Sequence, residues 1–132
     1  MLTVDLALRL RAQGLTWEPA SGDRFAIPHR DLDEHVFVVS EMTIDAVDIG
    51  PSRVVRFNGT TEWALDQIDA EEVVWLPHES QLRALLGPAF RALHSSEVGY
   101  AVEIREPHGL LSRHVAHDAE CAYALALLAL LV

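Results

Sequence analysis

The chain has 132 residues, half of them apolar, which is enough to bury one continuous core, so we expect a single domain covering residues 1–132. Its 20 acidic residues outnumber its 10 basic residues, all arginine, and the net charge of −10 argues against a nucleic-acid or membrane partner. One cysteine, Cys121, excludes an internal disulfide and a cysteine-based metal cluster, and the N-terminus lacks the basic start of a secretory signal, so we expect a cytoplasmic protein.

The N-terminal segment has the pattern of a capped helix. Thr3 precedes residues 4–13 as the N-cap, Asp5 lies in the first turn, where it complements the helix dipole, and Gly14 follows as a stop signal. We expect the buried stripe of this helix to consist of Leu2, Leu6 and Leu10.

The next segment predicts strands. Residues 24–27 are a short, mainly apolar run that ends before Pro28. Residues 35–46 carry most of their apolar side chains at even positions, which is the period of one long strand with its even side buried.

A hairpin is predicted after that strand. Residues 49–52 form a turn that leads into a returning strand, residues 53–57. Asn58-Gly59 then predicts a tight turn onto a further strand, residues 61–65. Thr60 would equally serve as the N-cap of a helix in the same place, and the two alternatives stay open.

The C-terminal half begins with a short strand at residues 73–76. It is followed by a leucine-rich helix, residues 79–93, which Gly87-Pro88 is expected to break into two pieces. Residues 98–106 and 110–115 predict a second hairpin because a proline and a glycine lie between them.

The last predicted element is a helix at residues 119–132, capped by Asp118, in which Glu120 is the only charged residue. It is shorter than the roughly 20 residues of a membrane span, so it is either a core helix lying across the sheet or a helix with one side covered by a second subunit in a homodimer. Together the elements predict an α+β fold with a mainly antiparallel sheet of five to six strands, an N-terminal helix, a broken middle helix and this apolar C-terminal helix.

One polar segment has residue types that bind metals. His29, Asp31, Asp33 and His35 share parity and would project to one side of an extended segment, and mixed imidazole and carboxylate ligands suit zinc, manganese or iron. This pattern predicts a small metal-assisted hydrolase, and the alternative is a solvated connector between two strands.

The tryptophans offer a second candidate site. Trp17, Trp63 and Trp75 each lie near acidic residues or a turn, and they would line a small-molecule pocket with Arg24 or Arg56 at its rim. The alternative role for the tryptophans is core packing.

Familiar catalytic motifs are absent from the sequence. There is no lysine, no glycine-rich phosphate loop, no dinucleotide fingerprint and no serine in a nucleophile elbow. Cys121 lies inside the apolar C-terminal helix, and His108, His114 and His117 have no defined common geometry. We therefore assign no catalytic residue and expect no cofactor.

Four short motifs are spread along most of the chain: Trp17-x-Pro19, Gly22-Asp23-Arg24-Phe25-x-Ile27-Pro28, FNGTTEWALD at residues 57–66, and Trp75-Leu76-Pro77. With these motifs the chain resembles a family of short, uncharacterised bacterial proteins that are sometimes labelled pilus-assembly proteins. The resemblance implies a compact stand-alone domain and supplies no catalytic residues.

The function predicted from these observations is a small cytoplasmic protein-binding or regulatory module that recognises another protein or its own copy through the C-terminal helix. The metal-assisted hydrolase and the tryptophan-lined small-molecule binder remain as alternatives.

Overall fold

The computed structural model describes residues 1–28, 32–39, 43–49, 52–58, 67–69 and 73–132, with the backbone alone for 32–35, 43–49, 52–58 and 67–69. The chain divides into two units. We call Met1–Thr16 together with Leu76–Val132 the helical unit, and Trp17–Trp75 the strand unit. Helices and antiparallel sheets are both present, so the predicted α+β class is confirmed.

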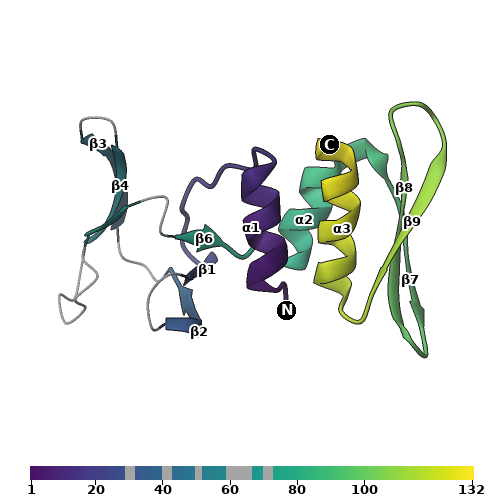
Figure 1. The fold of residues 1–132 in the computed structure, drawn as a ribbon, viewed down its shortest axis with the longest axis horizontal. Helices are drawn as coiled ribbons and strands as arrows, with labels where there is room; N and C mark the ends of the chain where they lie inside the picture. Colours follow the sequence, from purple (N-terminus) through teal and green to yellow (C-terminus); the bar gives the residue numbers. More distant parts are fainter. Residues whose placement is uncertain (29–31, 40–42, 50–51, 59–66, 70–72) are drawn as a thin grey trace. The chain divides into compact units, whose positions relative to one another are not determined.

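The helical unit contains all three α-helices of the described chain and one sheet (Figure 1). Its helices are α1 (Val4–Ala12), α2 (Glu79–Leu86), followed by the 3-10 turn η2 (Gly87–Ala89), and α3 (Ala119–Leu131). Its antiparallel sheet has the order β7-β8-β9, with β7 (Phe90–Ser96), β8 (Gly99–Arg105) and β9 (Leu111–Ala116).

Two of the helices begin where their caps predict. Thr3 Oγ1 accepts a hydrogen bond from the Leu6 amide at 3.3 Å, and Asp118 Oδ1 accepts one from the Cys121 amide at 3.2 Å. Gly14 follows α1 with a φ of 103°, a value that glycine adopts without the strain it causes in other residues. The predicted stripe of α1 is only partly confirmed, because Leu2 and Leu10 are buried together with Ala7 rather than with Leu6.

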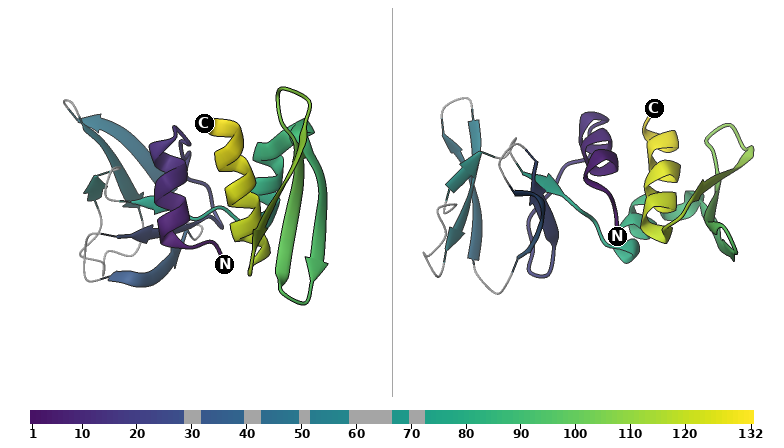
Figure 2. Two further views of the ribbon diagram at one scale, coloured as in Figure 1. Left: turned by 45° about the vertical axis from the view of Figure 1, so that its right-hand side comes forward. Right: turned by 60° about the horizontal axis from the view of Figure 1, so that its bottom comes forward.

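Helix α3 is the central element of the helical unit. It contacts α1, α2 and the strands β8 and β9, so it lies between α1 and the sheet, with α2 packed beside it (Figures 1 and 2). Seven of its residues are buried: Cys121, Ala122, Tyr123, Ala124, Ala126, Leu127 and Leu128. Because α1, α2 and the sheet of the same chain all contact α3, several sides of this helix are covered, which explains its apolar sequence and agrees with the prediction of a core helix. Self-association through α3 stays a prediction.

The predicted middle helix ends earlier than expected. Helix α2 ends at Leu86, Gly87 has a positive φ of 57°, and Pro88 cannot donate a helical hydrogen bond. The residues that follow form β7 instead of a second helical piece, because they gain a ladder of hydrogen bonds with β8 and because Phe90 stacks on Tyr123 with 5.8 Å between ring centroids. The hairpin predicted after this point is confirmed as β8 and β9.

The strand unit contains two further three-stranded antiparallel sheets. One has the order β2-β1-β6, with β1 (Arg24–Ile27), β2 (Leu32–Val38) and β6 (Val74–Trp75), and the other has the order β3-β4-β5, with β3 (Thr43–Ile49), β4 (Ser52–Asn58) and β5 (Gln67–Asp69). The described strands thus form three sheets of three strands, where the sequence predicted one sheet of five to six.

The predicted long strand at residues 35–46 is divided between two sheets. Strand β2 ends at Val38, and β3 begins at Thr43 in the other sheet. The predicted even-numbered buried side is also wrong in β2, because Val36 and Val38 are 37% and 60% exposed. Phe37 is the residue packed inward, since it stacks on Phe25 of β1 with 5.4 Å between ring centroids.

The predicted hairpin after the first turn is confirmed by the regular pairing of β3 with β4, although the turn residues 50–51 lie outside the described chain. Strand β4 pairs next with β5. Residues 61–65, for which a strand and a helix were both considered, also lie outside the described residues.

The single domain expected from the chain length stays a prediction, and two spectroscopic probes test it. All three tryptophans lie in the strand unit, whereas all described α-helices lie in the helical unit. If residues 1–132 are one domain, urea unfolding followed by tryptophan fluorescence and by helical circular dichroism gives one coincident transition. Two separate transitions would contradict a single cooperative domain.

Candidate functional site

The predicted metal-binding segment is only partly described. His29 and Asp31 lie outside the described residues, while Asp33 and His35 lie two positions apart on β2 with their backbone alone described. Among the described residues, no group of three or more histidine, cysteine, aspartate or glutamate side chains is placed to hold a metal ion. The metal site and the hydrolase that depends on it therefore stay predictions.

Two of the three tryptophans lie beside Phe25 in the sheet β2-β1-β6. The Trp17 ring packs against the Phe25 ring with 5.6 Å between centroids, and Trp75 is the register partner of Phe25 on β6. Trp63 lies outside the described residues, and Arg56 lies on β4 with its backbone alone described. Arg24 is the first residue of β1 and is half-buried.

Trp17 is fixed by a buried carboxylate. Asp23 is 5% exposed, and its Oδ2 accepts hydrogen bonds from Trp17 Nε1 at 2.9 Å and from the Ala20 amide at 3.0 Å. The Asp23 carbonyl oxygen also accepts from the Val39 amide at 2.8 Å, which joins this turn to the end of β2. Trp17 packs against a core cluster that contains Phe25, so these contacts support the core-packing role for this residue.

Removing the Asp23 carboxylate is expected to destabilise the strand unit. Asp23→Ala leaves the Trp17 indole N–H and the Ala20 amide without their acceptor, so the free energy of unfolding should fall by about 1–3 kcal/mol. Asp23→Asn is the matched control, because it keeps one acceptor oxygen and should cost less. Urea unfolding followed by tryptophan fluorescence measures both, and equal losses for the two variants would contradict this role of the carboxylate.

Trp75 differs from Trp17 in the hydrogen bonding of its indole N–H. Its indole Nε1 is buried and has no hydrogen-bond partner among the described residues. Trp75, Phe25 and Phe37 occupy opposing register positions on three adjacent strands, which in an antiparallel sheet lie on the same side. Phe25 of this aromatic row belongs to the core cluster of the strand unit and Phe37 packs against it, whereas Trp75 is half-buried, and the small-molecule pocket predicted around the tryptophans stays a prediction.

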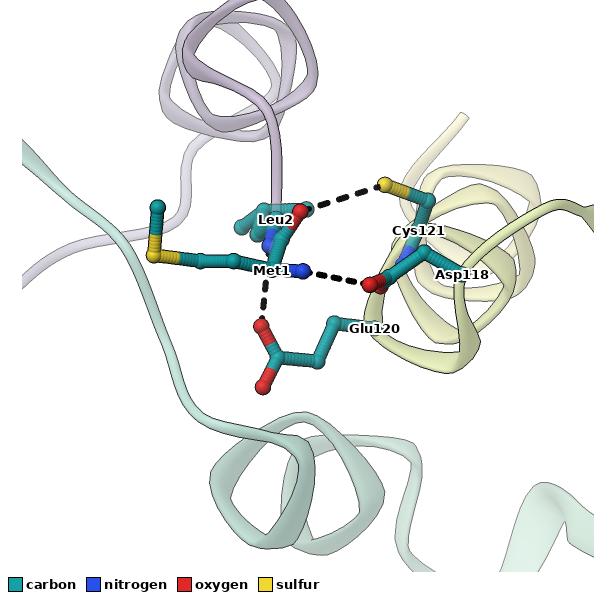
Figure 3. A network of polar contacts seen from close by, with 5 residues as sticks. All are labelled: Met1, Leu2, Asp118, Glu120 and Cys121. Atoms are coloured by element: carbon teal, nitrogen blue, oxygen red, sulfur yellow. Dashed lines mark hydrogen bonds and ion pairs between the residues drawn. The ribbon is translucent and has the colours of Figure 1, made fainter. Parts of the chain in front are cut away.

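A polar network joins the start of the chain to the start of α3 (Figure 3). The N-terminal ammonium of Met1 forms an ion pair with Asp118, and the Leu2 amide donates to Glu120 Oε1 at 2.8 Å. The Cys121 thiol donates to the Met1 carbonyl at 3.7 Å. Burial raises the pKa of the Cys121 thiol, which disfavours the nucleophilic thiolate, so we interpret this network as a structural connection between α1 and α3.

The Met1–Asp118 ion pair gives a pH dependence to stability. The hydrogen bond that the Met1 ammonium donates to Asp118 raises the pKa of this ammonium. Burial alone would raise the pKa of Asp118, but hydrogen bonds from the ammonium and from the Cys121 amide outweigh burial and lower it. The ammonium's contribution to the free energy of unfolding is lost as pH rises through its raised pKa. The contribution of the Asp118 carboxylate is lost as pH falls through its lowered pKa. The pair therefore stabilises the fold fully between about pH 4 and about pH 8.

Asp118→Asn tests this dependence because asparagine keeps the N-cap and removes only the charge. The difference in free energy of unfolding between the unmodified protein and the variant should be largest in that window at low salt and should shrink on both sides of it. Thermal unfolding measured over a pH series checks this. A difference that stays constant across the series would contradict the ion pair.

The histidines near the last hairpin do not converge. His108 Nε2 lies 2.7 Å from Glu106 Oε2 in the turn, whereas His114 Nε2 lies 3.0 Å from Ser112 Oγ within β9. A serine beside a histidine is the start of a nucleophile and base pair, but a catalytic pair also needs a group that orients the histidine. The structure gives His114 no such contact within the described residues, and we assign the pair no catalytic role.

The sheet of the helical unit has one side turned away from α3, which we call the open face. On β8 the buried Val102 and Ile104 lie on the α3 side, and strand alternation puts the residues between and beside them on the other side. The open face of β8 and β9 consists of Ala101, Glu103, Arg105, Leu111, Arg113 and Val115.

The open face combines exposed apolar residues with one ion pair. Leu111 and Val115 are 52% and 58% exposed, and Arg113 lies between them with its Nε 3.2 Å from Glu103 Oε1. The two apolar side chains lie on β9, which is an edge strand and pairs only with β8 in the described part of the chain. These residues were not predicted from the sequence, although Leu111 and Val115 share odd-numbered positions on one strand.

Comparison with protein-family models, with curated proteins and with solved structures finds no match to this chain. Within the described residues, no helix combines the length and the apolar character needed to cross a membrane.

Proposed function

We propose that the protein is a protein-binding module whose docking surface is the open face of the β7-β8-β9 sheet together with the edge of β9 that pairs with no other described strand. The observation that carries this proposal is the exposure of Leu111 and Val115 on an edge strand, in a sheet whose other side is occupied by α3. Exposed apolar side chains beside an edge with unpaired backbone N–H and C=O groups favour the addition of another polypeptide.

The two edges of this sheet differ, and the difference favours β9. Strand β7 carries a register shift between Phe90 and Ala92, which begins two residues after Pro88, and such irregularities protect an edge from further pairing. Strand β9 pairs with β8 in continuous register from Leu111 to Ala116. Neither strand contains proline, glycine or lysine, so the register shift in β7 is the difference that leaves β9 as the edge more open to a further strand.

The test compares partners captured by the unmodified chain and by a double variant, Leu111→Glu with Val115→Glu, from a lysate of the cells in which the protein is native. The matched control is Val38→Glu on β2, where the valine is 60% exposed, close to the 58% of Val115, but lies in the strand unit. We expect a saturable partner to be bound by the unmodified chain and by the control and lost from the double variant. Equal recovery by all three would contradict the proposal.

We also propose a cytoplasmic location, which the single cysteine supports. The resemblance to short, uncharacterised bacterial proteins is kept as a proposal and agrees with a small module that has no catalytic motif.

A further inference from the structure

We infer that the occupant of the β9 edge is β9 of a second copy, paired antiparallel about a two-fold axis at Arg113. The inference rests on the proposed function and names the partner for the same surface. It differs from self-association through α3, because the contact here is between edge strands.

Strand geometry limits how two copies of β9 can pair. A two-fold axis that joins two antiparallel edge strands stands perpendicular to the sheet, so each residue faces one from the same side of the sheet. Only registers centred on a residue satisfy this condition. Within β9, the centres that keep most of the six residues paired are Arg113 and His114.

The register centred on Arg113 places apolar side chains opposite apolar side chains. It places Leu111 opposite Val115 of the second copy, and Val115 opposite the second Leu111, which gives two apolar pairs on the open face. The register centred on His114 would instead place each Val115 opposite an arginine. Because directly opposite side chains are the unit of sheet stabilisation, the first register is favoured.

Charge at the centre of this register is balanced within each copy. Two Arg113 side chains face each other across the axis, which would be unfavourable for bare cations. Each Arg113 already has an ion pair with its own Glu103 at 3.2 Å, so the centre of the interface is a group of two arginines and two glutamates with no net charge.

The distribution of charge along the chain also permits a second copy at this edge. The helical unit has seven acidic residues and six arginines, whereas the strand unit has thirteen acidic residues and four arginines. Nearly all of the net charge of −10 is therefore in the strand unit. Two nearly neutral helical units can approach each other with little repulsion between their net charges.

Sedimentation equilibrium over the micromolar to millimolar range tests the dimer. The unmodified chain should show a concentration-dependent dimer. The dissociation constant of the Leu111→Glu and Val115→Glu double variant should be at least about tenfold higher, because both apolar pairs are lost and glutamates face each other. Val38→Glu should dimerise as the unmodified chain does. A strict monomer, or a dimer unaffected by the double variant, would overturn the inference.

Disulfide formation tests the register. Arg113→Cys puts two thiols opposite each other at the axis, whereas the thiols of Val115→Cys are four residues apart along the strand and out of reach. Cys121 is 8% exposed and is present in both variants, so it serves as an internal control. Mild oxidation should link copies of Arg113→Cys and not of Val115→Cys, and the reverse would overturn this register. If the chain is monomeric but still captures a different partner through Leu111 and Val115, the inference that the partner is a second copy is wrong, whereas the proposed protein-binding function stands.

Discussion

Tyr123→Ala is expected to lower the free energy of unfolding of the helical unit by about 3–5 kcal/mol, in the range of buried aromatic residues replaced by alanine. Tyr123 lies in the second turn of α3, is 1% exposed, and stacks on Phe90. Arg83 of α2 lies over the Phe90 ring, 4.2 Å from its centroid. Removing the Tyr123 ring would therefore leave a cavity between α2, α3 and β7. Urea unfolding followed by helical circular dichroism measures the loss.

Tyr123→Phe is the control that separates the ring from the hydroxyl. Burial raises the pKa of the Tyr123 hydroxyl, so the group is protonated at neutral pH and contributes no charge to the core. The phenylalanine variant keeps the stacked ring and should cost less than about 1.5 kcal/mol. If the alanine variant cost no more than the phenylalanine variant, α3 would not be the centre of this core.

Gly99→Ala is expected to cost about 2–4 kcal/mol, because steric overlap and backbone strain act together. Gly99 is the first residue of β8 and has a φ of 139°. A Cβ atom added there would lie 2.4 Å from the carbonyl oxygen of Ala116. That oxygen belongs to the backbone at the end of β9, so it cannot turn away as a flexible side chain would. The substitution should separate β8 from β9 at this end of the sheet.

Gly109→Ala is the matched control for the strain alone. Gly109 has a φ of 93°, but an added Cβ would meet nothing within 4 Å. It should therefore cost only about 1 kcal/mol. Urea unfolding of the two variants, with amide exchange in β8 and β9, checks the prediction. Equal losses of unfolding free energy in the two variants would mean that the close approach to the Ala116 carbonyl is not what makes alanine unfavourable at position 99.

Local signals allowed parts of the fold to be predicted. Thr3 and Asp118 are cap residues next to apolar runs, and the proline and glycine between β8 and β9 define a turn, so α1, α3 and that hairpin follow from neighbouring residues. These elements depend on interactions over a few positions, which a sequence displays directly.

The wrong or incomplete predictions involve residues far apart in the chain. The leucines of residues 79–93 fit a helical period, but β7 is selected by its pairing with β8, which a local pattern does not show. In β2 the even-numbered valines looked buried, whereas the larger ring of Phe37 packs on Phe25 of a different strand. The division of the strands among three sheets likewise depends on which strands pair.

The candidate surface was hidden in the sequence for a similar reason. Leu111 and Val115 fall on the same side of the predicted strand with Arg113 between them, and this pattern does not tell which side of the strand is buried. Only the position of α3 on the side of Val102 and Ile104 shows that the odd-numbered residues of β9 are the exposed ones. The hydrogen bond from Trp17 to Asp23 was missed too, since the sequence shows a tryptophan near an acid without indicating that the acid is buried.

Hydrogen–deuterium exchange along β9 is the most direct test of the central claim that its edge is the docking site. The amides of Leu111–Ala116 should exchange more slowly as protein concentration rises, or when the captured partner is bound, while those of Phe90–Ser96 on the opposite edge stay unchanged. Unchanged exchange in β9 under both conditions, or protection that develops on β7 instead, would contradict it.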